Sequence, residues 1–336
     1  MDNFIFSQNP ADLPASWDDV FCNQPLMNRV FLTHLHRTNP LIQRYFWEDP
    51  DSADKLCGAI CEALIPFRIG RFAFYSKGVF CSIPMPLGFE PGFAPIEKLK
   101  DVVGIMGRQK KGFQMIMGLG GEMPELKGWS WKRHYIAVNI RTNFKNFEEY
   151  LDNFRHVYRR PLKQSISKWE RVNITLSQGD AFGRKDYDLY LAVLKKQGQT
   201  YSALPMDFFK CIPIEHYFIK AYHGEALLGW IVVIPYGKKL YPLFVGIDYK
   251  YNKRYDTYFN ILTEAVKYAI KNRIDEVKMG QTAELAKIRL GGIPQEVHFL
   301  VRHTNPIMNL IIGRTDIFNY RKRYKPFRVF KTFGNN

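Results

Sequence analysis

Hydrophobic and polar positions alternate in a regular order in the second half of the chain, and this order predicts a sheet. Tyr217 to Tyr222 is an apolar run, Ala226 to Ile234 is a second one rich in β-branched residues, and the polar turn between them predicts a hairpin. Leu240 to Ile247 is the third predicted strand. Pro242 inside it indicates an edge or a bulge, because proline cannot donate a ladder hydrogen bond. A bulge at this position would splay the sheet.

Helical spacing follows this sheet pattern. Between Asp256 and Lys271, apolar side chains recur at the i, i+3, i+4, i+7 positions of an amphipathic helix. Ile274 to Met279 predicts a short strand, and Thr282 is expected to cap a further helix that ends at Leu290. Residues 297–302 alternate again, which predicts a half-buried strand.

Strands joined by helices in this order predict the α/β class with a mixed sheet. In such sheets, ligands gather beyond strand ends and at helix N-termini, where unpaired backbone amides point outward. The candidate site is therefore the segment from Gly246 to Thr257.

The first 133 residues alternate less regularly. Helices are predicted at 17–21, 28–36 and 95–109, and strands at 56–66, 79–83 and 113–118. The glycine- and proline-rich segment 118–128 is the best candidate for a boundary, and residues 135–140 would open the second half. Two structural halves are expected, which suits 336 residues of 46% hydrophobic composition.

Several short segments, taken as a set, carry a family resemblance. They are Asn146 to Leu151, Tyr158 to Arg160 with Lys168, Leu204 to Phe209, Gly224 to Gly229, and Gly280 to Glu284 with Lys287 and Leu290 to Gly292. Together with the strand and helix order, they resemble the GNAT superfamily of N-acyltransferases, and in particular its FemAB-like branch, which is built from two GNAT-like halves. The resemblance covers residues 134–303. It implies a degenerate GNAT-like half at 1–133, an acyltransferase half at 134–312 and a basic aromatic tail at 313–336.

The donor segment departs from the family pattern. GNAT enzymes that use acetyl-CoA usually carry a glycine-spaced loop that cradles the pyrophosphate, whereas the corresponding loop here, Asp248 to Tyr255, has no glycine. Its cations could neutralise phosphates directly. The resemblance therefore leaves acyl-CoA, an acyl carrier protein and an aminoacyl-tRNA open as donors, with no covalently bound cofactor. The residues expected to hold the donor are Phe244, Val245, Gly246, Lys250, Asn252, Lys253 and Arg254.

Three side chains are candidates for catalysis. Asp248 could accept the proton of an attacking ammonium group, although a carboxylate in a strand-end turn explains it equally simply. Tyr249 could protonate a leaving thiolate or ribose hydroxyl, where the alternative is half-buried packing. Glu284 and Lys287 could form a simple surface pair on a helix, but family position makes both plausible in an acceptor pocket. The residues expected to bind the acceptor are Gln281, Lys287, His298 and Arg302.

Charge extends the range of partners. The formal net charge of +16 favours an acidic partner such as tRNA, an acyl carrier protein or an anionic membrane surface. Basic and aromatic residues interleave from Arg314 to Lys331, which suits RNA or a membrane surface, unless the tail simply packs on the first half. A second basic run consists of Arg155, Arg159, Arg160, Lys163, Lys168 and Arg171.

Other observations narrow the setting and the chemistry. Five irregularly placed cysteines and the lack of a signal peptide or a long apolar run indicate a reducing, cytoplasmic location, with the inner membrane face as a possible site of attachment. No metal-ligand spacing, phosphate loop or nucleophile elbow is present. The sequence thus predicts direct acyl or aminoacyl transfer to an amine of a bulky, lipid- or envelope-linked acceptor. The alternative is a non-catalytic protein that keeps the fold and binds RNA or membrane.

Overall fold

The computed structural model describes residues 4–39, 41–48, 55–69, 72–85, 89–109, 112–121, 123–199, 203–321 and 327–331. It divides into two compact units. The first unit comprises Met1–Tyr135 and Glu296–Arg321, and the second comprises Ile136–Gln295 and Lys322–Asn336. Each unit is built around its own sheet.

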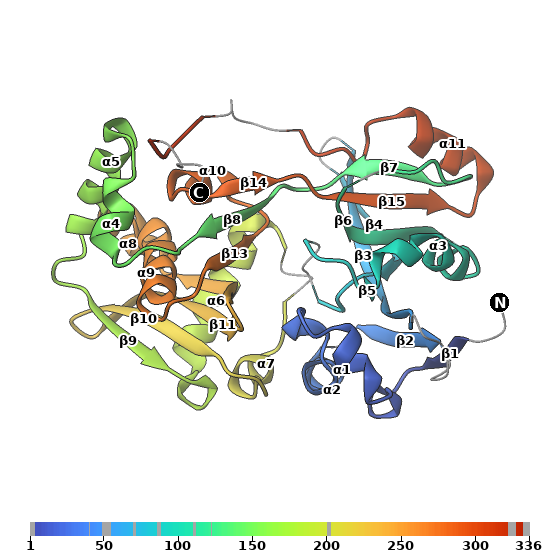
Figure 1. Ribbon diagram of the computed structural model, residues 1–336, viewed down its shortest axis with the longest axis horizontal. Helices are drawn as coiled ribbons and strands as arrows, with labels where there is room; N and C mark the ends of the chain where they lie inside the picture. The colour runs from blue at the N-terminus through green and yellow to red at the C-terminus, as the bar shows by residue number, and fades with distance from the viewer. Residues whose placement is uncertain are drawn as a thin grey trace. The chain divides into compact units, whose positions relative to one another are not determined.

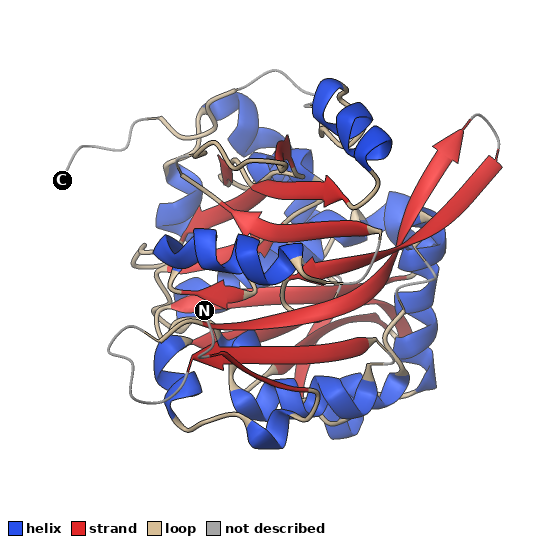
Figure 2. Ribbon diagram, turned by 90° about the vertical axis from the view of Figure 1, so that its right-hand side faces the viewer, coloured by secondary structure: helices blue, strands red, loops and turns tan. Residues whose placement is uncertain are grey.

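The first unit holds an eight-stranded sheet in the order β1-β2-β3-β4-β6-β15-β7, with β5 paired to β3. Its strand pairs are antiparallel except for the parallel pair β4–β6. Figure 2 shows the β3–β4 hairpin extending beyond the other strands. The strands are β1 Phe4–Ser7, β2 Ile42–Glu48, β3 Cys57–Ile69, β4 Phe72–Cys81, β5 Phe93–Ala94, β6 Phe113–Leu119, β7 Ser130–Arg133 and β15 His298–His303, and the α-helices are α1 Ser16–Val20, α2 Arg29–Thr38, α3 Leu99–Gly107 and α11 Pro306–Arg314.

The last strand of the chain, β15, lies inside the sheet of the first unit. It pairs with β6 on one side and with β7 on the other. A strand is present here, as predicted, but Phe299, Leu300 and Val301 are all buried, so both of its faces lie in a core and the expected half-buried pattern is wrong. The core is that of the first unit, however. The division therefore differs from the predicted range 134–312, because residues 296–312 complete the sheet of the first unit.

The second unit holds a seven-stranded sheet in the order β14-β8-β13-β12-β11-β10-β9. The strands are β8 Ala137–Arg141, β9 Asn173–Ser177, β10 Tyr217–His223, β11 Ala226–Tyr236, β12 Lys239–Ile247, β13 Glu276–Gly280 and β14 Ile293–Gln295, and the α-helices are α4 Phe147–Asp152, α5 His156–Ser167, α6 Arg184–Gln197, α7 Met206–Lys210, α8 Tyr249–Tyr255, α9 Thr257–Lys271 and α10 Glu284–Arg289. The predicted hairpin (β10–β11), third strand (β12), amphipathic helix (α9) and short strand (β13) are all present (Figure 1).

The bulge predicted at Pro242 is present. Val232 pairs with Phe244 and Val233 with Pro242, so one extra residue of β12 is accommodated between these two pairs. On its other side, β12 pairs in parallel with β13 only at Lys239 and Leu240. Beyond Leu240 the two parallel strands separate toward their carboxyl ends. The mixed sheet is therefore splayed at the position where the sequence placed the bulge.

Two helices cover the sheet of the second unit on opposite faces. Gly229 and Trp230 are neighbours on β11, and neighbouring strand residues point to opposite faces. Gly229 lies against Thr257 at the start of α9, whereas the Trp230 indole Nε1 donates to the carbonyl oxygen of Asp186 in α6 at 2.9 Å. The splayed pair β12–β13 thus lies between two helical layers, which keeps its apolar side chains out of water.

Candidate functional site

The carboxyl end of β12 leads directly into a helix. Asp248 is the N-cap of α8, and its carboxylate accepts a hydrogen bond from the backbone N–H of Lys250 at 2.9 Å. The segment Asp248–Tyr255, expected as a phosphate-binding loop, is therefore a capped helix. The physical reason is local, because an aspartate followed by residues without glycine or proline favours a helix start. An acidic cap at this end is unfavourable for a second anion.

The polar side chains of α8 are exposed or used within the fold. Lys253 and Arg254 lie in its last turn and are exposed, as is Lys250 in its first turn. The guanidinium of Arg254 lies over the ring of Tyr255, 5.2 Å from its centre. Asn252 accepts a hydrogen bond from the backbone N–H of Tyr258 at 2.9 Å, which satisfies an amide at the start of α9. These cations are thus presented by a helix surface rather than by a loop.

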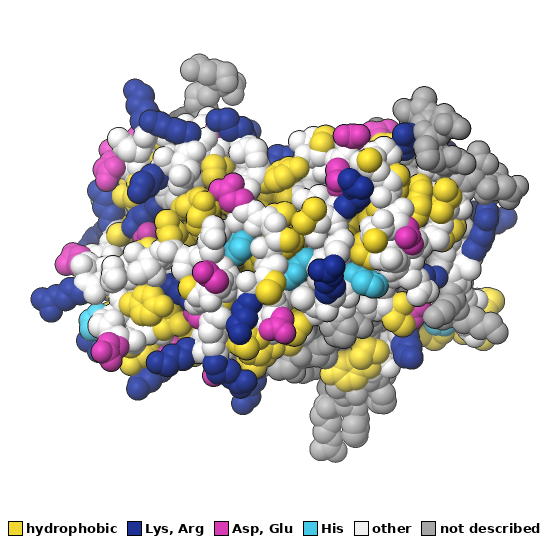
Figure 3. Space-filling model, turned by 90° about the horizontal axis from the view of Figure 1, so that it is seen from below, with side chains coloured by type: hydrophobic (Ala, Val, Ile, Leu, Met, Phe, Trp, Pro, Cys, Tyr) yellow, Lys and Arg dark blue, Asp and Glu magenta, His cyan; other side chains and the backbone are white. Residues whose placement is uncertain are grey.

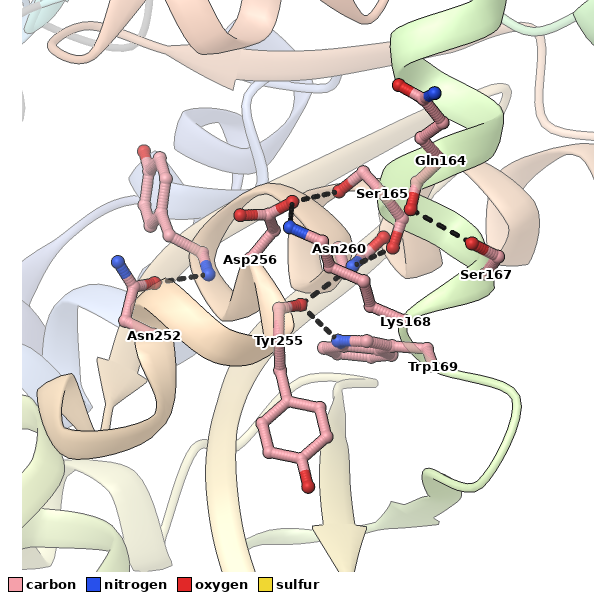
Figure 4. A network of polar contacts seen from close by, with 10 residues as sticks. Gln164, Ser165, Ser167, Lys168, Trp169, Asn252, Tyr255, Asp256 and Asn260 are labelled. Carbon is pink, nitrogen blue, oxygen red and sulfur yellow. Dashed lines mark hydrogen bonds and ion pairs between the residues drawn. The ribbon is translucent and has the colours of Figure 1, made fainter.

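The junction of α8 and α9 is held by the C-terminal turn of α5 (Figure 4). Asp256, between the two helices, has a left-handed backbone with φ of 46°. Its carboxylate accepts hydrogen bonds from Ser165 at 3.1 Å and from the Lys168 ammonium at 2.7 Å. The side-chain amide of Asn260 donates to the carbonyl oxygens of Ser165 and Tyr255. These contacts fix α5 against the helices that follow β12.

Phe244 and Gly246 contribute to packing on the α6 face of β12. The ring of Phe244 makes edge contacts with Tyr190, Phe208 and Phe209. A Cβ atom added to Gly246 would lie 2.2 Å from Nε1 of Trp230, so no larger residue fits there without movement. Val245, between them on the strand, is half-buried. The glycine is explained by the indole packed against it, and this feature is not visible in the sequence pattern.

Tyr249 begins α8 and is half-buried. Burial raises its pKa, and the ammonium of Lys196 lies 3.9 Å above the centre of its ring. A phenol with a raised pKa stays protonated at neutral pH. Tyr249 is therefore chemically suited to donate a proton and unsuited to accept one.

The turn after β13 has an unusual backbone. Gly280, Thr282 and Ala283 all have left-handed φ values, of 67°, 63° and 46°. Such values are rare for residues with a side chain and are maintained only where surrounding contacts impose them. The sequence predicted Thr282 as the cap of the next helix, and this prediction is wrong: α10 begins at Glu284 with Ala283 as its N-cap and has no side-chain cap.

Lys287 supplies contacts that hold this turn. Its side chain is buried, with 4% of the residue exposed, and its ammonium nitrogen donates to the carbonyl oxygens of Gly280 at 3.3 Å and Gln281 at 2.6 Å. The surface pair with Glu284, weighed as the simplest interpretation of the sequence, is therefore wrong for Lys287. The residue lies beyond the carboxyl end of β13, the strand that separates from β12.

The environment of Lys287 changes its protonation. Burial lowers its pKa to about 7, and the nearby carboxylate of Glu284 opposes this shift only in part. A lysine amine with a pKa near neutrality exists in both protonation states at physiological pH. The neutral amine keeps two N–H groups for the carbonyl oxygens of Gly280 and Gln281 and has one lone pair left. Lys287 can therefore accept a proton without giving up its contacts with the turn.

His298 and Arg302, expected in the acceptor site, belong to β15 and hence to the first unit. The His298 ring makes an edge contact with Trp131, and burial lowers its pKa. The guanidinium of Arg302 lies 5.5 Å from the centre of the Trp129 ring. Both side chains therefore contact tryptophans of their own unit, whereas the other predicted site residues lie in the second unit.

Three cations of the second basic run, Arg159, Arg160 and Lys163, lie on the surface of α5. A cavity of about 540 Å³ is lined by His156, Arg159, Arg160, Lys163, Gln164 and Ser167. A neighbouring cavity of about 420 Å³ shares Lys163 and Ser167 with it. Arg159 is paired with Asp152 at 2.9 Å, while Arg160 and Lys163 are exposed. We call the surface defined by the six residues of the larger cavity the α5 groove.

The described part of the C-terminal tail packs beside the α5 groove. The backbone N–H of Arg155 donates to the carbonyl oxygen of Val329 at 2.9 Å, and the Tyr158 ring stacks on Phe327. Phe330 is buried among aromatic residues of α4 and its neighbours. Residues 327–331 thus contact the second unit rather than the first, while Lys322, Arg323, Tyr324 and Lys325 lie outside the described residues.

A buried ion pair was not foreseen from the sequence. Lys220 in β10 contacts Asp186 in α6 at 2.9 Å, and both are buried. The available signal was a lysine inside the apolar run Tyr217 to Tyr222, but nothing local indicates its partner 34 residues upstream. Asp186 also accepts from the backbone N–H of Gly183, so the pair fixes the start of α6.

Within the described residues, no helix is long and apolar enough to span a membrane, and no cluster of three or more metal-ligating side chains occurs. All five cysteines are free thiols. Figure 3 shows basic side chains spread over one face of the molecule with acidic ones between them, in agreement with the net charge of +16.

Comparison with known proteins rests on structure alone. No protein-family model and no curated protein sequence matches the chain. L-PGS from Bacillus licheniformis matches with a TM-score of 0.52 at 11% identity, over 94% of this chain and 99% of that one. A tandem GNAT protein from the clavulanic acid biosynthesis pathway matches with a TM-score of 0.50 at 9% identity, over 90% and 99%.

The chain has a double GNAT-like fold. FemX also matches, with a TM-score of 0.48 at 10% identity, over 82% of this chain and 91% of that one. The expected fold is confirmed, including a GNAT-like character in the first unit, which the sequence indicated only weakly. At these identities the comparison carries no residue roles, so the site rests on its own geometry.

Proposed function

We propose that the chain is an N-acyltransferase, which moves an acyl or aminoacyl group from an activated thioester or ester to the amine of a bulky acceptor. The amine nitrogen forms a bond to the carbonyl carbon, the C–S or C–O bond breaks, and its electron pair leaves with the sulfur or oxygen. The attacking nitrogen releases one proton. The double GNAT-like fold supports the reaction class. The observation that carries the proposal is the burial of Lys287, which lowers its pKa to about 7.

Lys287 is proposed as the group that accepts the proton. It lies beyond the carboxyl end of β13, and Phe244 to Gly246 lie near the carboxyl end of β12, so the two ends of the splayed parallel pair bound the site. A general base works best with a pKa near the operating pH. The pKa of about 7 meets this condition, whereas Asp248 is occupied as a helix cap. Tyr249 remains the proposed proton donor for the leaving group.

The favoured donor is an aminoacyl-tRNA. At the end of β12 the chain enters α8, which has an acidic cap, so there is no glycine loop there to hold a CoA pyrophosphate. The α5 groove instead offers exposed cations on one face of a long helix, which suits the repeated phosphates of a nucleic acid. Lys250, Lys253 and Arg254 would add charge from α8 of the same unit. The acceptor is proposed to be a lipid- or envelope-linked amine, with Gln281 and Glu284 in its pocket.

The test presents purified protein with acyl-CoA, acyl carrier protein thioesters and aminoacyl-tRNA, each with a panel of amines, and follows transfer by mass spectrometry. Transfer from aminoacyl-tRNA is expected, with log rate rising with pH to a plateau above about pH 7. Lys287→Met is expected to lower the rate by about a hundredfold or more, the size of a general-base contribution. The matched control is Lys278→Met, which replaces a lysine of β13 and should retain the wild-type rate of transfer. Absence of transfer from every donor would overturn the proposal.

The second candidate function is a non-catalytic protein that binds RNA. The observation in its favour is the capped, glycine-free end of β12, which has lost the usual donor loop. It predicts salt-sensitive RNA binding with no transfer, unchanged in Lys287→Met. Transfer that depends on Lys287 would reject it.

A further inference from the structure

Helix α11 of the first unit presents an apolar face to solvent. Ile307, Leu310 and Ile311 are 69%, 52% and 42% exposed, and with Arg314 they follow the i, i+3, i+4, i+7 spacing of one helix face. Ile317, just after the helix, is exposed as well. The pattern is the reverse of an ordinary surface helix, in which the outward face is polar. We call Ile307, Leu310, Ile311 and Arg314 the outer face of α11.

The contacts that hold α11 are made by its other side. Ile312 is 1% exposed and belongs to an apolar cluster with residues of β6 and β15. Asn309 donates to the carbonyl oxygen of Gly128 and accepts from the backbone N–H of His303. Lys132 donates to the carbonyl oxygen of Thr315 at the end of the helix, at 2.6 Å. The helix is therefore fully seated without its outer face, and Figure 1 shows it beside β7 and β15.

We propose that α11 docks the protein on an anionic lipid bilayer, with the outer face inserted at the level of the headgroups. Contiguous exposed apolar side chains mark interaction surfaces. Exposed aliphatic side chains beside an arginine suit the boundary between the headgroups and the acyl chains of a bilayer. With nine residues, the helix is too short to span one. The inference is independent of acyl transfer.

Charge favours lipid over a second copy of the chain. Arg314 lies on the outer face, no acidic residue occurs between 306 and 314, and the chain carries a net charge of +16. A contact between two copies through this face would bring together two chains that each carry a net charge of +16, with an Arg314 from each copy in the same interface. A phosphate-bearing surface accepts the aliphatic side chains and the guanidinium at once.

The first test measures sedimentation of the full chain with phosphatidylcholine vesicles, with or without phosphatidylglycerol. Wild type is expected to bind the anionic vesicles. The variant Ile307→Gln/Leu310→Gln/Ile311→Gln should lose this binding by about tenfold or more, and Arg314→Gln should weaken binding to the anionic vesicles by about fivefold. The matched control, Val30→Gln/Ile42→Gln/Leu64→Gln, changes three apolar side chains that are equally exposed in the same unit and should bind as wild type does.

Two outcomes would overturn the proposal. One is vesicle binding by the outer-face variant that equals that of wild type, or no vesicle binding by wild type at all. The other is a dimer of wild type by light scattering that the outer-face variant converts to a monomer, because this result would assign the face to a second copy.

A second readout reports insertion directly. Ile311→Cys carries an environment-sensitive fluorophore in a Cys22→Ser/Cys211→Ser background, which removes the two exposed thiols. The remaining three are buried, and burial raises the pKa of Cys57 to about 12 and of Cys61 to about 11, so they label poorly. Fluorescence at position 311 should increase and shift to the blue with anionic vesicles, whereas Val30→Cys should show no change. An unchanged signal at position 311 would contradict insertion.

Discussion

The carboxylate of Asp248 has a structural partner, the backbone N–H of Lys250, and this contact sets a prediction at the level of one residue. Asp248→Ala should destabilise the protein by about 0.5–2 kcal/mol, because the first turn of α8 loses its cap. Asp248→Asn should retain wild-type stability, because asparagine caps equally well. Urea unfolding of the two variants measures the difference.

The same pair of variants separates the cap from a catalytic base. With Lys287 as the proton acceptor, Asp248→Asn should also retain transfer. Stability kept but turnover lost in Asp248→Asn would instead assign the base to Asp248.

Lys287 gives a prediction about pH. Its folded pKa of about 7 is lower than the ordinary value of 10.5, so between these values the unfolded state binds more protons than the folded state. Stability should therefore rise with pH from about 7 upward, by at most about 1.4 kcal/mol per pH unit from this residue. Below pH 7 the contribution is at its minimum, because both states are then protonated.

The measurement compares urea unfolding of wild type and Lys287→Met at pH 7, 8 and 9. The free energy of unfolding of wild type should increase relative to that of Lys287→Met by up to about 1.4 kcal/mol per pH unit as the pH rises. Lys278→Met, whose lysine is only half-buried and paired with Glu276, should follow the wild-type slope. If the free energies of unfolding of wild type and Lys287→Met rise with pH at the same slope, the pKa of Lys287 is not lowered in the folded state.

Residue-scale features were only partly visible in the sequence. Lys287 was named from the resemblance, but its burial depends on the turn Gly280–Ala283. Gly246 was named among the residues expected to hold the donor, yet the close indole of Trp230 comes from a neighbouring strand. Sequence reasoning identifies residue types at strand ends, whereas burial and contact partners are set by segments distant in the chain.

At the scale of elements, α5 carries the surface that we propose binds the phosphates of tRNA. Arg160 and Lys163 are exposed in the α5 groove, so their replacement should cost little stability. Arg160→Glu/Lys163→Glu is predicted to weaken tRNA binding by about tenfold or more and to reduce the slope of log affinity against log salt by about 1 to 2. Fluorescence anisotropy across a salt series measures both.

A charge-matched control tests whether position matters. Lys271→Glu/Lys239→Glu makes the same change in charge on α9 and β12 of the same unit. The prediction fails if this control weakens binding as much as the α5 variant, since net charge alone would then account for the effect.

Elements with regular apolar spacing were predicted, whereas α8 was missed despite its local signal. The β10–β11 hairpin and α9 have regular apolar spacing and a polar turn or cap, and both are present. The α8 helix was mistaken for a loop because the family pattern was given more weight than the local sequence, in which Asp248 is a good N-cap. α5 contains Pro161 and few buried residues, so it depends on the hydrogen bonds that Asp256 and Asn260 make with Ser165 in its last turn.

At the scale of the whole chain, the path of the backbone explains why the domain boundary was misplaced. The alternation at 297–302 predicts a strand, but alternation does not reveal which sheet a strand joins. In the structure, β15 returns to the first unit, so residues 136–295 are inserted between two adjacent strands of one sheet. The order along the chain therefore differs from the order in space.

This insertion leads to the last prediction. β7 and β15 are antiparallel neighbours in which Arg133 lies opposite His298, and the backbone N–H of His134 already donates to the carbonyl oxygen of Val297 at 2.8 Å. Joining Tyr135 directly to Glu296 would thus close a hairpin through four residues, a common loop length. The fused chain 1–135/296–321 should fold cooperatively, because it retains every strand of the first sheet. The fragment 1–135 should not, because it loses β15 from between β6 and β7 together with the buried side chains Phe299, Leu300 and Val301. Circular dichroism with thermal melting distinguishes the two chains, and a cooperative melt of 1–135 alone would show that β15 is dispensable to the first unit.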